Sequence, residues 1–229
     1  EQGHRVTVLD NLTTGKLQNI AHRMQHPRFR FVRGSILDVK LVDRLTAEAD
    51  SIYHLAAVVC VKYVVDDPLE GMLVNIKGTE TVLEAALRHR RKVLIASSSE
   101  VYGKSNQVPF RETDNSVFGP TSIPRWSYAL SKALDEHFAF AYHRQRGLKT
   151  TAVRYFNAYG PRLDPRGYGS VVARFITQAL TGQALTVYGD GQQTRSFTFV
   201  QDTVRGTMAA MSTPEGEGLA FNIGNTREI

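Results

Sequence analysis

The chain has 229 residues, of which 42% are hydrophobic and 22% are charged, and its formal net charge is +6. No stretch reaches the roughly 18 consecutive apolar residues of a membrane-spanning helix, so we expect no membrane partner. No run of about five or six basic residues is present, so the positive charge does not indicate nucleic-acid binding. The single cysteine excludes an internal disulfide bond and favours a reducing, cytoplasmic compartment.

Strand-like and helical segments alternate along the chain. Apolar segments typical of strands occupy 6–9, 29–32, 51–55, 93–96 and 151–155. Apolar residues recur at helical spacing over 73–87 and 130–141. This alternation predicts an α/β fold, a Rossmann-like doubly wound parallel sheet with helices on both faces. The apolar run 55–61 is interpreted as the buried end of a strand.

Ser98, Tyr128 and Lys132 form a set suited to removing a proton from an alcohol or sugar hydroxyl. Ser98 follows a predicted strand, whereas Tyr128 and Lys132 stand four residues apart on a predicted helix and share one face. The pKa of a free tyrosine is about 10 and must fall by about 3 units, worth about 4 kcal/mol, for Tyr128 to act as a base near pH 7. A lysine ammonium at about 4 Å, together with a positively charged nicotinamide, supplies a shift of that size. Such a spacing also arises by chance, but the serine upstream favours the catalytic interpretation.

Three other charged residues have both a functional and an ordinary interpretation. Asp10 closes the first strand, where a carboxylate either binds the ribose hydroxyls of an adenosine, favouring NAD over NADP, or caps a turn. Glu100 is either a surface residue or a second acid or base beside Ser98. Arg195 follows a glycine-rich turn and either binds a diphosphate or remains a solvated charge. The histidines show no metal-binding spacing, so no metal site is predicted.

These features together resemble the extended short-chain dehydrogenase/reductase family. They are most similar to its NAD-dependent nucleotide-sugar epimerases, dehydratases and decarboxylases, such as UDP-glucose 4-epimerases and UDP-glucuronate decarboxylases. The likeness covers nearly the whole chain. Besides the Ser98, Tyr128 and Lys132 set, it is carried by Leu9-Asp10-Asn11-Leu12-Thr13-Thr14-Gly15, Gly34-Ser35-Ile36-Leu37-Asp38, His54-Leu55-Ala56-Ala57, Asn75-x-x-Gly78-Thr79, Arg154-Tyr155-Phe156-Asn157-Ala158-Tyr159-Gly160-Pro161-Arg162, and Val187-Tyr188-Gly189-Asp190-Gly191 leading to Arg195.

The resemblance implies a cofactor and a substrate for particular residues. It implies that NAD is bound by Asp10, Asn11, Asp38, Ala56, Tyr128, Lys132 and Tyr155. It implies that a nucleotide-sugar, most simply a UDP-sugar, is bound by Asn157, Val187, Tyr188 and Arg195. It also implies a homodimer, with the Asn75 helix and the Tyr128 helix as the candidate interface.

The resemblance implies a common first step, in which the sugar C4 hydroxyl is oxidised to a ketone. Our leading expectation from the sequence is a UDP-hexose 4-epimerase, which needs no second carboxylate. The alternatives are a UDP-glucuronate decarboxylase or a nucleotide-sugar 4,6-dehydratase that uses Glu100. Arg125-Trp126, just before Tyr128, is similar to one decarboxylase subgroup. A non-catalytic dinucleotide-binding protein is a further alternative.

The resemblance also divides the chain into two parts. We expect an NAD-binding Rossmann domain over 1–160 and a substrate-binding lobe over 161–229, part of which can return to the Rossmann sheet. Glu1–His4 is typical of the last turn of a helix, and 220–224 of a strand without continuation. We therefore expect further segments on both sides, including a first strand with its glycine-rich loop, and expect the 229-residue chain alone to be inactive.

Overall fold

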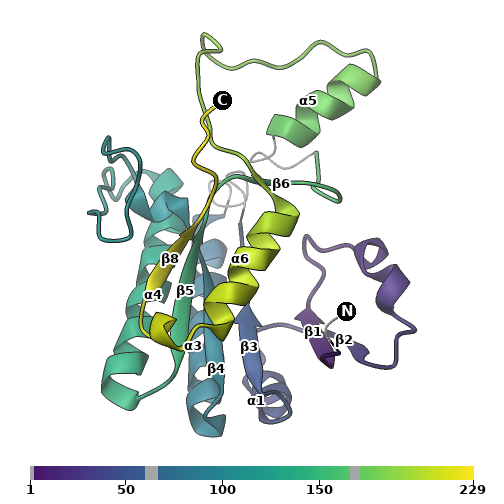
Figure 1. The fold of residues 1–229 in the computed structure, drawn as a ribbon, viewed down its shortest axis with the longest axis vertical. Coiled ribbons are helices and arrows are strands. Elements are labelled where there is room, and N and C mark those ends of the chain that lie inside the picture. The colour runs from purple at the N-terminus through teal and green to yellow at the C-terminus, as the bar shows by residue number, and fades with distance from the viewer. Residues whose placement is uncertain (1–2, 60–66, 166–170) are drawn as a thin grey trace.

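The computed structural model describes residues 3–59, 67–165 and 171–229 (Figure 1). Its larger sheet is parallel, with the strand order β3-β4-β5-β8, and a second parallel pair is formed by β1 and β2. The strands are β1 (Val6–Asp10), β2 (Phe29–Arg33), β3 (Ser51–His54), β4 (Lys92–Ser98), β5 (Thr150–Tyr155), β6 (Ala158–Tyr159), β7 (Thr198–Phe199) and β8 (Ala220–Ile223). The predicted α/β class and the five predicted strands are confirmed, with ends displaced by at most two residues.

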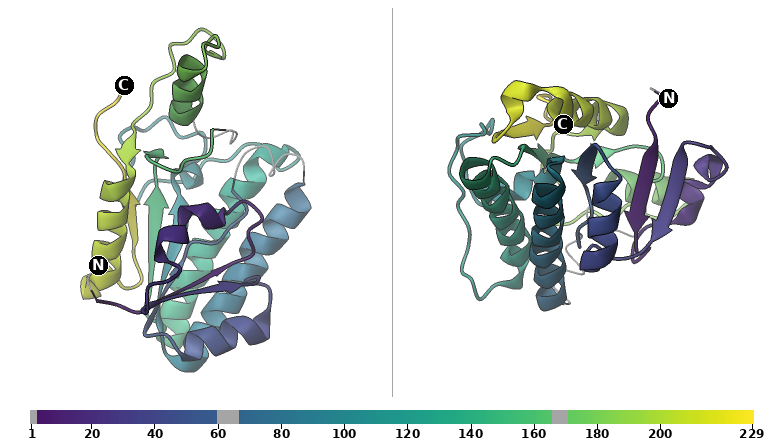
Figure 2. Two further views of the ribbon diagram at one scale, coloured as in Figure 1. Left: turned by 90° about the vertical axis from the view of Figure 1, so that its right-hand side faces the viewer. Right: turned by 90° about the horizontal axis from the view of Figure 1, so that it is seen from below.

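Helices cover both faces of the larger sheet. The α-helices in the described residues are α1 (Val39–Ala47), α3 (Pro68–His89), α4 (Ser127–Arg146), α5 (Val171–Leu180) and α6 (Val200–Ser212). Figure 2 shows α6 on one face and α1, α3 and α4 on the other. The helical spacing seen over 73–87 and 130–141 therefore belongs to α3 and α4.

Side chains along β4 point alternately to the two faces of the sheet, and this explains why helices pack on both faces. Val93 and Ile95 pack with Leu83 and Ala139 of α3 and α4, whereas Leu94, which points the other way, packs with Met211 of α6. All three β4 side chains are fully buried, as expected for a parallel strand covered on both faces. The core therefore fixes the position of the carboxyl end of β4, where Ser98 lies.

Local signals set the ends of the two long helices. The Asp67 carboxylate accepts a hydrogen bond from the Glu70 main-chain N–H at 3.1 Å, and Pro68 occupies the first turn of α3. Gly147 ends α4 in the left-handed conformation, at φ 69°. These caps set where α3 begins and where α4 ends.

The smaller sheet stands beside the larger one without pairing to it. Among the described strands, β1 pairs with β2 and β3 pairs with β4, so β1 and β3 each keep one unpaired edge. The expectation that a further strand belongs here stays a prediction. Residues 1–2 of the predicted terminal helical turn lie outside the described residues.

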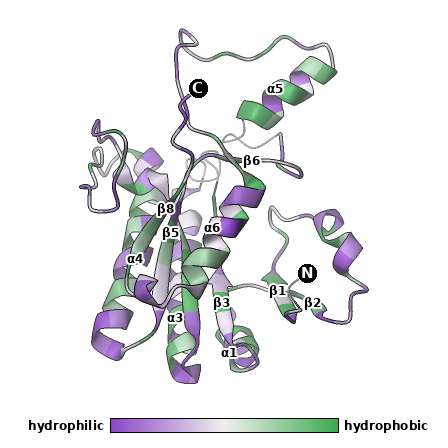
Figure 3. Cartoon of the chain, in the orientation of Figure 1, coloured by the Kyte–Doolittle hydropathy of each residue, from purple (hydrophilic) through white to green (hydrophobic). Residues whose placement is uncertain are grey.

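Two parts of the chain differ from a simple two-lobe division. β8 pairs with β5, so 220–223 belongs to the larger sheet, while the boundary at residue 160 stays a prediction. α5 carries many apolar residues (Figure 3), yet none of its residues is buried.

The interpretation of 55–61 as a buried strand end is wrong for the described part of that run. β3 ends at His54, and Leu55 is 56% exposed. The reason is that this segment forms one wall of an open cavity, so its side chains are not covered. Cys60 and Val61 lie outside the described residues.

Candidate active site

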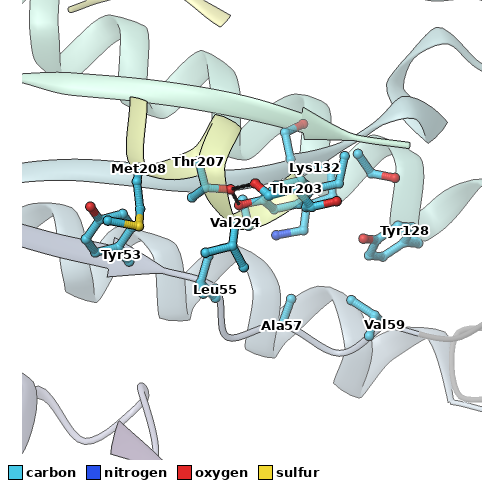
Figure 4. A pocket seen from close by; sticks show the side chains of 14 residues that line it. Tyr53, Leu55, Ala57, Val59, Tyr128, Lys132, Thr203, Val204, Thr207 and Met208 are labelled. Atoms are coloured by element: carbon cyan, nitrogen blue, oxygen red, sulfur yellow. Dashed lines mark hydrogen bonds between the residues drawn. The ribbon is translucent and has the colours of Figure 1, made fainter. Parts of the chain in front are cut away.

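Ser98, Tyr128 and Lys132 converge on one cavity of about 420 Å³. The cavity lies at the carboxyl ends of β3, β4 and β5, which is where ligands bind in open α/β sheets. Tyr128 and Lys132 point into it from α4 (Figure 4). Its lining consists of Tyr53, Leu55, Ala57, Val59, Ala96, Ser97, Ser98, Tyr128, Lys132, Tyr155, Thr203, Val204, Thr207 and Met208.

Hydrogen bonds from α3 hold α4 and the segment after β3 in place. The Asn75 amide nitrogen donates to Ser131 Oγ at 3.1 Å and to the Val58 carbonyl at 3.2 Å. Its amide oxygen accepts from the Val58 N–H at 2.7 Å. Ser131 precedes Lys132, so this buried amide fixes the helix that carries Tyr128 and Lys132.

A second buried network ties α4 to β4 and β5. Arg154 donates through Nε and Nη2 to the two carboxylate oxygens of Glu136, at 2.9 and 2.7 Å. Glu136 also accepts a hydrogen bond from Ser97, the neighbour of Ser98. Arg154 Nη1 donates to the Tyr102 hydroxyl at 2.8 Å. These bonds set the register between Ser98 and the helix of Tyr128.

The electrostatics of Tyr128 differ from the expectation. Burial raises the pKa of Tyr128 to about 12; the hydrogen bond with Ser98 lowers it, and the negative charges of Glu100 and Asp135 raise it further. The Lys132 ammonium donates instead to Asp135 Oδ2 at 3.1 Å. The lowering of the Tyr128 pKa that was predicted from Lys132 is therefore absent in the protein by itself.

Glu100 lies next to this set. It belongs to the 3₁₀ turn Ser99–Tyr102 that follows β4, and its main-chain N–H donates to Ser98 Oγ at 3.2 Å. Its carboxylate lies 2.8 Å from the Arg125 guanidinium, which stacks 5.4 Å from the ring centroid of Trp126. Glu100 thus lies near Tyr128 and is held by an arginine.

The residues predicted for the adenosine half of NAD lie away from the cavity lining. Asp10 accepts from the Leu12 N–H at 2.6 Å, and Asp38 caps α1 by accepting from the Leu41 N–H at 3.0 Å. Asn11 accepts hydrogen bonds from Thr13. The cofactor roles of Asp10, Asn11 and Asp38 therefore remain predictions. The same holds for Ala56, which follows β3. Tyr155 does line the cavity, and its hydroxyl lies 2.8 Å from Thr207 Oγ1.

The predicted substrate residues also lie outside the cavity lining. Asn157 Nδ2 donates to the Ser196 carbonyl at 3.2 Å, and Arg195 Nη1 donates to the Thr194 carbonyl at 2.6 Å. Val187 and Tyr188 are exposed. Their contacts with a nucleotide stay predictions.

The wall of the cavity that α6 supplies was not predicted from the sequence. Thr203 and Thr207, and likewise Val204 and Met208, are four residues apart and face the cavity together. That spacing was visible in the sequence, but nothing in it showed that α6 lies over this edge of the sheet. Tyr53, on β3, was missed for the same reason.

Within residues 3–59, 67–165 and 171–229, no three His, Cys, Asp or Glu residues gather in a way that could hold a metal ion. No helix in those ranges combines the length and apolarity needed to cross a bilayer.

The sequence of residues 1–224 matches the NAD-dependent epimerase/dehydratase family. The chain belongs to this family. It is 43% identical over 228 residues to a UDP-N-acetyl-alpha-D-glucosaminuronate decarboxylase of Bacillus cytotoxicus, covering 100% of this chain and 70% of that protein. It spans about half the length of several curated UDP-glucuronic acid decarboxylases.

Solved structures of other family members have the same fold. A UDP-glucose 4-epimerase of Thermotoga maritima with UDP-glucose is 32% identical, with a TM-score of 0.88 over 99% of this chain and 71% of that chain. A dTDP-glucose 4,6-dehydratase of Streptomyces venezuelae with NAD bound is 33% identical, with a TM-score of 0.87 over 98% of this chain and 67% of that chain. The enzyme class and the predicted dependence on NAD are thereby confirmed.

The cavity fits this cofactor. Leu55, Ala57 and Val59 give it an apolar wall, and Tyr128 and Lys132 place polar groups opposite that wall. An apolar pocket with a few convergent polar groups is typical of a cofactor site.

Proposed function

We propose that the protein decarboxylates a UDP-linked uronic acid through a 4-keto sugar. The observation that carries this proposal is the Glu100–Arg125 ion pair beside Tyr128. A 4-epimerase needs no second carboxylate, whereas a decarboxylase acts on a carboxylate that an arginine can bind. The 43% identity to a decarboxylase supports the same choice.

The first step is oxidation at the sugar C4. Tyr128 takes the proton of the C4 hydroxyl, and Ser98 donates a hydrogen bond to the same oxygen. Bound NAD would supply a hydride acceptor for C4 and a positive charge near Tyr128. Lys132 and Tyr155 would hold the cofactor against the apolar wall of the cavity.

The second step follows from the chemistry of the ketone. With a C4 carbonyl, the C6 carboxylate belongs to a β-keto acid, so the C5–C6 bond breaks and carbon dioxide leaves. Its electron pair forms an enolate across C5, C4 and O4, and C5 must then receive a proton. A substrate carboxylate that binds Arg125 displaces Glu100 from its cation, which raises the proton affinity of Glu100 and suits it to deliver that proton.

The 4-epimerase expected from the sequence is supported less well than the decarboxylase that was its alternative. The first relative reported above is a decarboxylase at 43% identity, and the epimerase structure is 32% identical. A 4,6-dehydratase also uses a second carboxylate and remains the competing use of Glu100. The UDP-sugar substrate, the homodimer through α3 and α4, and the cytoplasmic location remain parts of this proposal.

The test is a product assay on the full-length enzyme with NAD. UDP-glucuronate, UDP-N-acetylglucosaminuronate and UDP-glucose are incubated separately, and the products are read by mass spectrometry. We expect loss of carbon dioxide from at least one uronate and no reaction of UDP-glucose. Loss of water would instead identify a dehydratase, and an epimer of unchanged mass would identify an epimerase.

A further inference from the structure

Lys132 has a buried partner that the mechanism above does not use. Its ammonium lies 3.1 Å from Asp135 Oδ2, one helical turn along α4. Lys132 is 2% exposed and Asp135 is 0% exposed. Asp135 Oδ1 has no hydrogen-bond partner among the described residues. The pair is therefore shielded from water, unlike most ion pairs between residues three apart on a helix.

Groups from three elements face this pair. Tyr128 and Glu136 come from α4 itself, and Glu136 accepts hydrogen bonds from Nε and Nη2 of Arg154. His54 comes from β3, and its Nε2 lies 3.0 Å from Thr79 Oγ1 of α3. Thr79 also forms a side-chain hydrogen bond with Asp135 that lowers the pKa of that carboxyl. Glu100, in the turn after β4, raises the pKa of Tyr128 and is paired with Arg125.

The neighbouring groups leave Asp135 as the counter-charge. Burial, together with the nearby Lys132 charge, lowers the pKa of His54 to about 3, so His54 is neutral and offers no negative charge. Burial also raises the pKa of Asp135, and the Lys132 ammonium acts against that rise. A buried ammonium without a paired carboxylate gives up its proton at a lower pH than an exposed one.

We propose that Asp135 is a positioning residue that keeps Lys132 protonated and holds its ammonium at the wall of the cavity. In an exposed ion pair of this spacing, the carboxylate would have little effect on the protonation of the lysine, because water screens the interaction. Here both groups are buried and screening is weak, so the charge of Lys132 depends on Asp135. This inference rests on the proposed function only for the effect that Asp135 has on the rate of the reaction.

The first test measures the proton on Lys132 directly. The 229-residue chain is labelled with trace acetic anhydride across a pH series, and labelling of Lys132 and of the exposed Lys149 is read by mass spectrometry. In the wild type, we expect Lys132 to titrate at or above the pH of Lys149. Titration of Lys132 well below that of Lys149 would overturn the proposal without any variant being made.

The second test removes the charge while keeping the shape. In Asp135→Asn, we expect the pH midpoint of the Lys132 labelling curve to fall by about one pH unit or more. Asp135→Glu restores the charge and should restore most of the shift. Asp202→Asn, which removes an exposed carboxylate three residues from Arg205 on α6, serves as the control and should leave Lys132 unchanged. An unchanged Lys132 titration in folded Asp135→Asn would contradict the proposal.

The third test separates positioning from a structural role. In the full-length enzyme, kcat/KM of Asp135→Asn should decline above neutral pH where the wild type remains active. A uniform loss with an unchanged pH profile would show that Asp135 acts only in packing. If the labelling shift is found but no uronate is decarboxylated, the proposed function fails and this inference stands.

Discussion

Glu100 and Arg125 meet at 2.8 Å, although one follows β4 and the other precedes α4. Their side chains are 34% and 40% exposed, so a ligand can reach both groups. The pair thereby joins the turn after Ser98 to the start of the helix that carries Tyr128. A substrate carboxylate would compete with Glu100 for this guanidinium, which is why the pair bears on the choice of reaction.

Glu100→Gln tests the second carboxylate. We expect oxidation at C4 and carbon dioxide release to persist, and protonation of C5 to slow by about 10²- to 10⁴-fold, the usual contribution of a general acid or base. The measurement compares NADH absorbance, carbon dioxide release and formation of the C5-protonated sugar in single turnovers. Glu84→Gln, on the exposed face of α3, is the control. Equal rates in Glu100→Gln and the wild type would make Glu100 a bystander.

Arg125→Met tests recognition of the substrate carboxylate. Loss of one charged hydrogen bond costs about 1.5–3 kcal/mol, so we expect KM for the uronate to rise by about 10- to 100-fold. Binding of UDP-glucose, measured by calorimetry with NAD present, should change little. The control is Arg30→Met, which breaks the exposed 2.8 Å ion pair between Arg30 and Glu48. It should affect neither value. If both ligands weaken equally, Arg125 does not read the carboxylate.

Burial of His54 makes stability depend on pH. Its folded pKa of about 3 lies below the unfolded value of about 6.5, so the unfolded chain takes up a proton first as pH falls. The free energy of unfolding should therefore decrease by about 1.4 kcal/mol for each pH unit below about 6.5 from this residue.

Urea denaturation at several pH values checks this dependence. His54→Gln, which keeps a donor near Thr79, should flatten the slope between pH 6 and pH 4, whereas exposed His22→Gln should not. A slope that is the same in His54→Gln and in the wild type would assign the acid sensitivity to other groups.

Much of the site could be predicted from the sequence because its signals are local. Ser98 ends a strand, and Tyr128 and Lys132 share a helical face, so their placement depends only on regular geometry. The Asp135 partner was also visible as a spacing of three residues. Its burial was not, because that depends on how α3 and β3 pack over α4.

The less predictable part depends on tertiary contacts. The positions of β8 and α6 follow from packing against β5 and from the apolar cluster around Leu94. Arg125 was noted only as part of a subgroup motif. Its contact with Glu100 joins two short 3₁₀ turns, Ser99–Tyr102 and Pro124–Trp126, which are too short to show a periodic pattern in the sequence.

The buried pair of Glu136 and Arg154 is expected to dominate the stability of the site. Glu136→Gln leaves a buried guanidinium without its counter-charge, which costs about 3–5 kcal/mol. Glu48→Gln, in the exposed pair with Arg30, should cost less than about 1 kcal/mol. Urea denaturation of the two variants makes the comparison. A similar small cost for both would show that the network around Ser97 is not needed to hold α4.

The most direct measurement is carbon dioxide release from UDP-uronate labelled isotopically at C6, with the full-length enzyme and NAD. The account predicts labelled carbon dioxide from the wild type, none from Tyr128→Phe, and a normal yield from Tyr142→Phe on the same helix. Retention of all label, together with conversion of UDP-glucose to its C4 epimer, would contradict it.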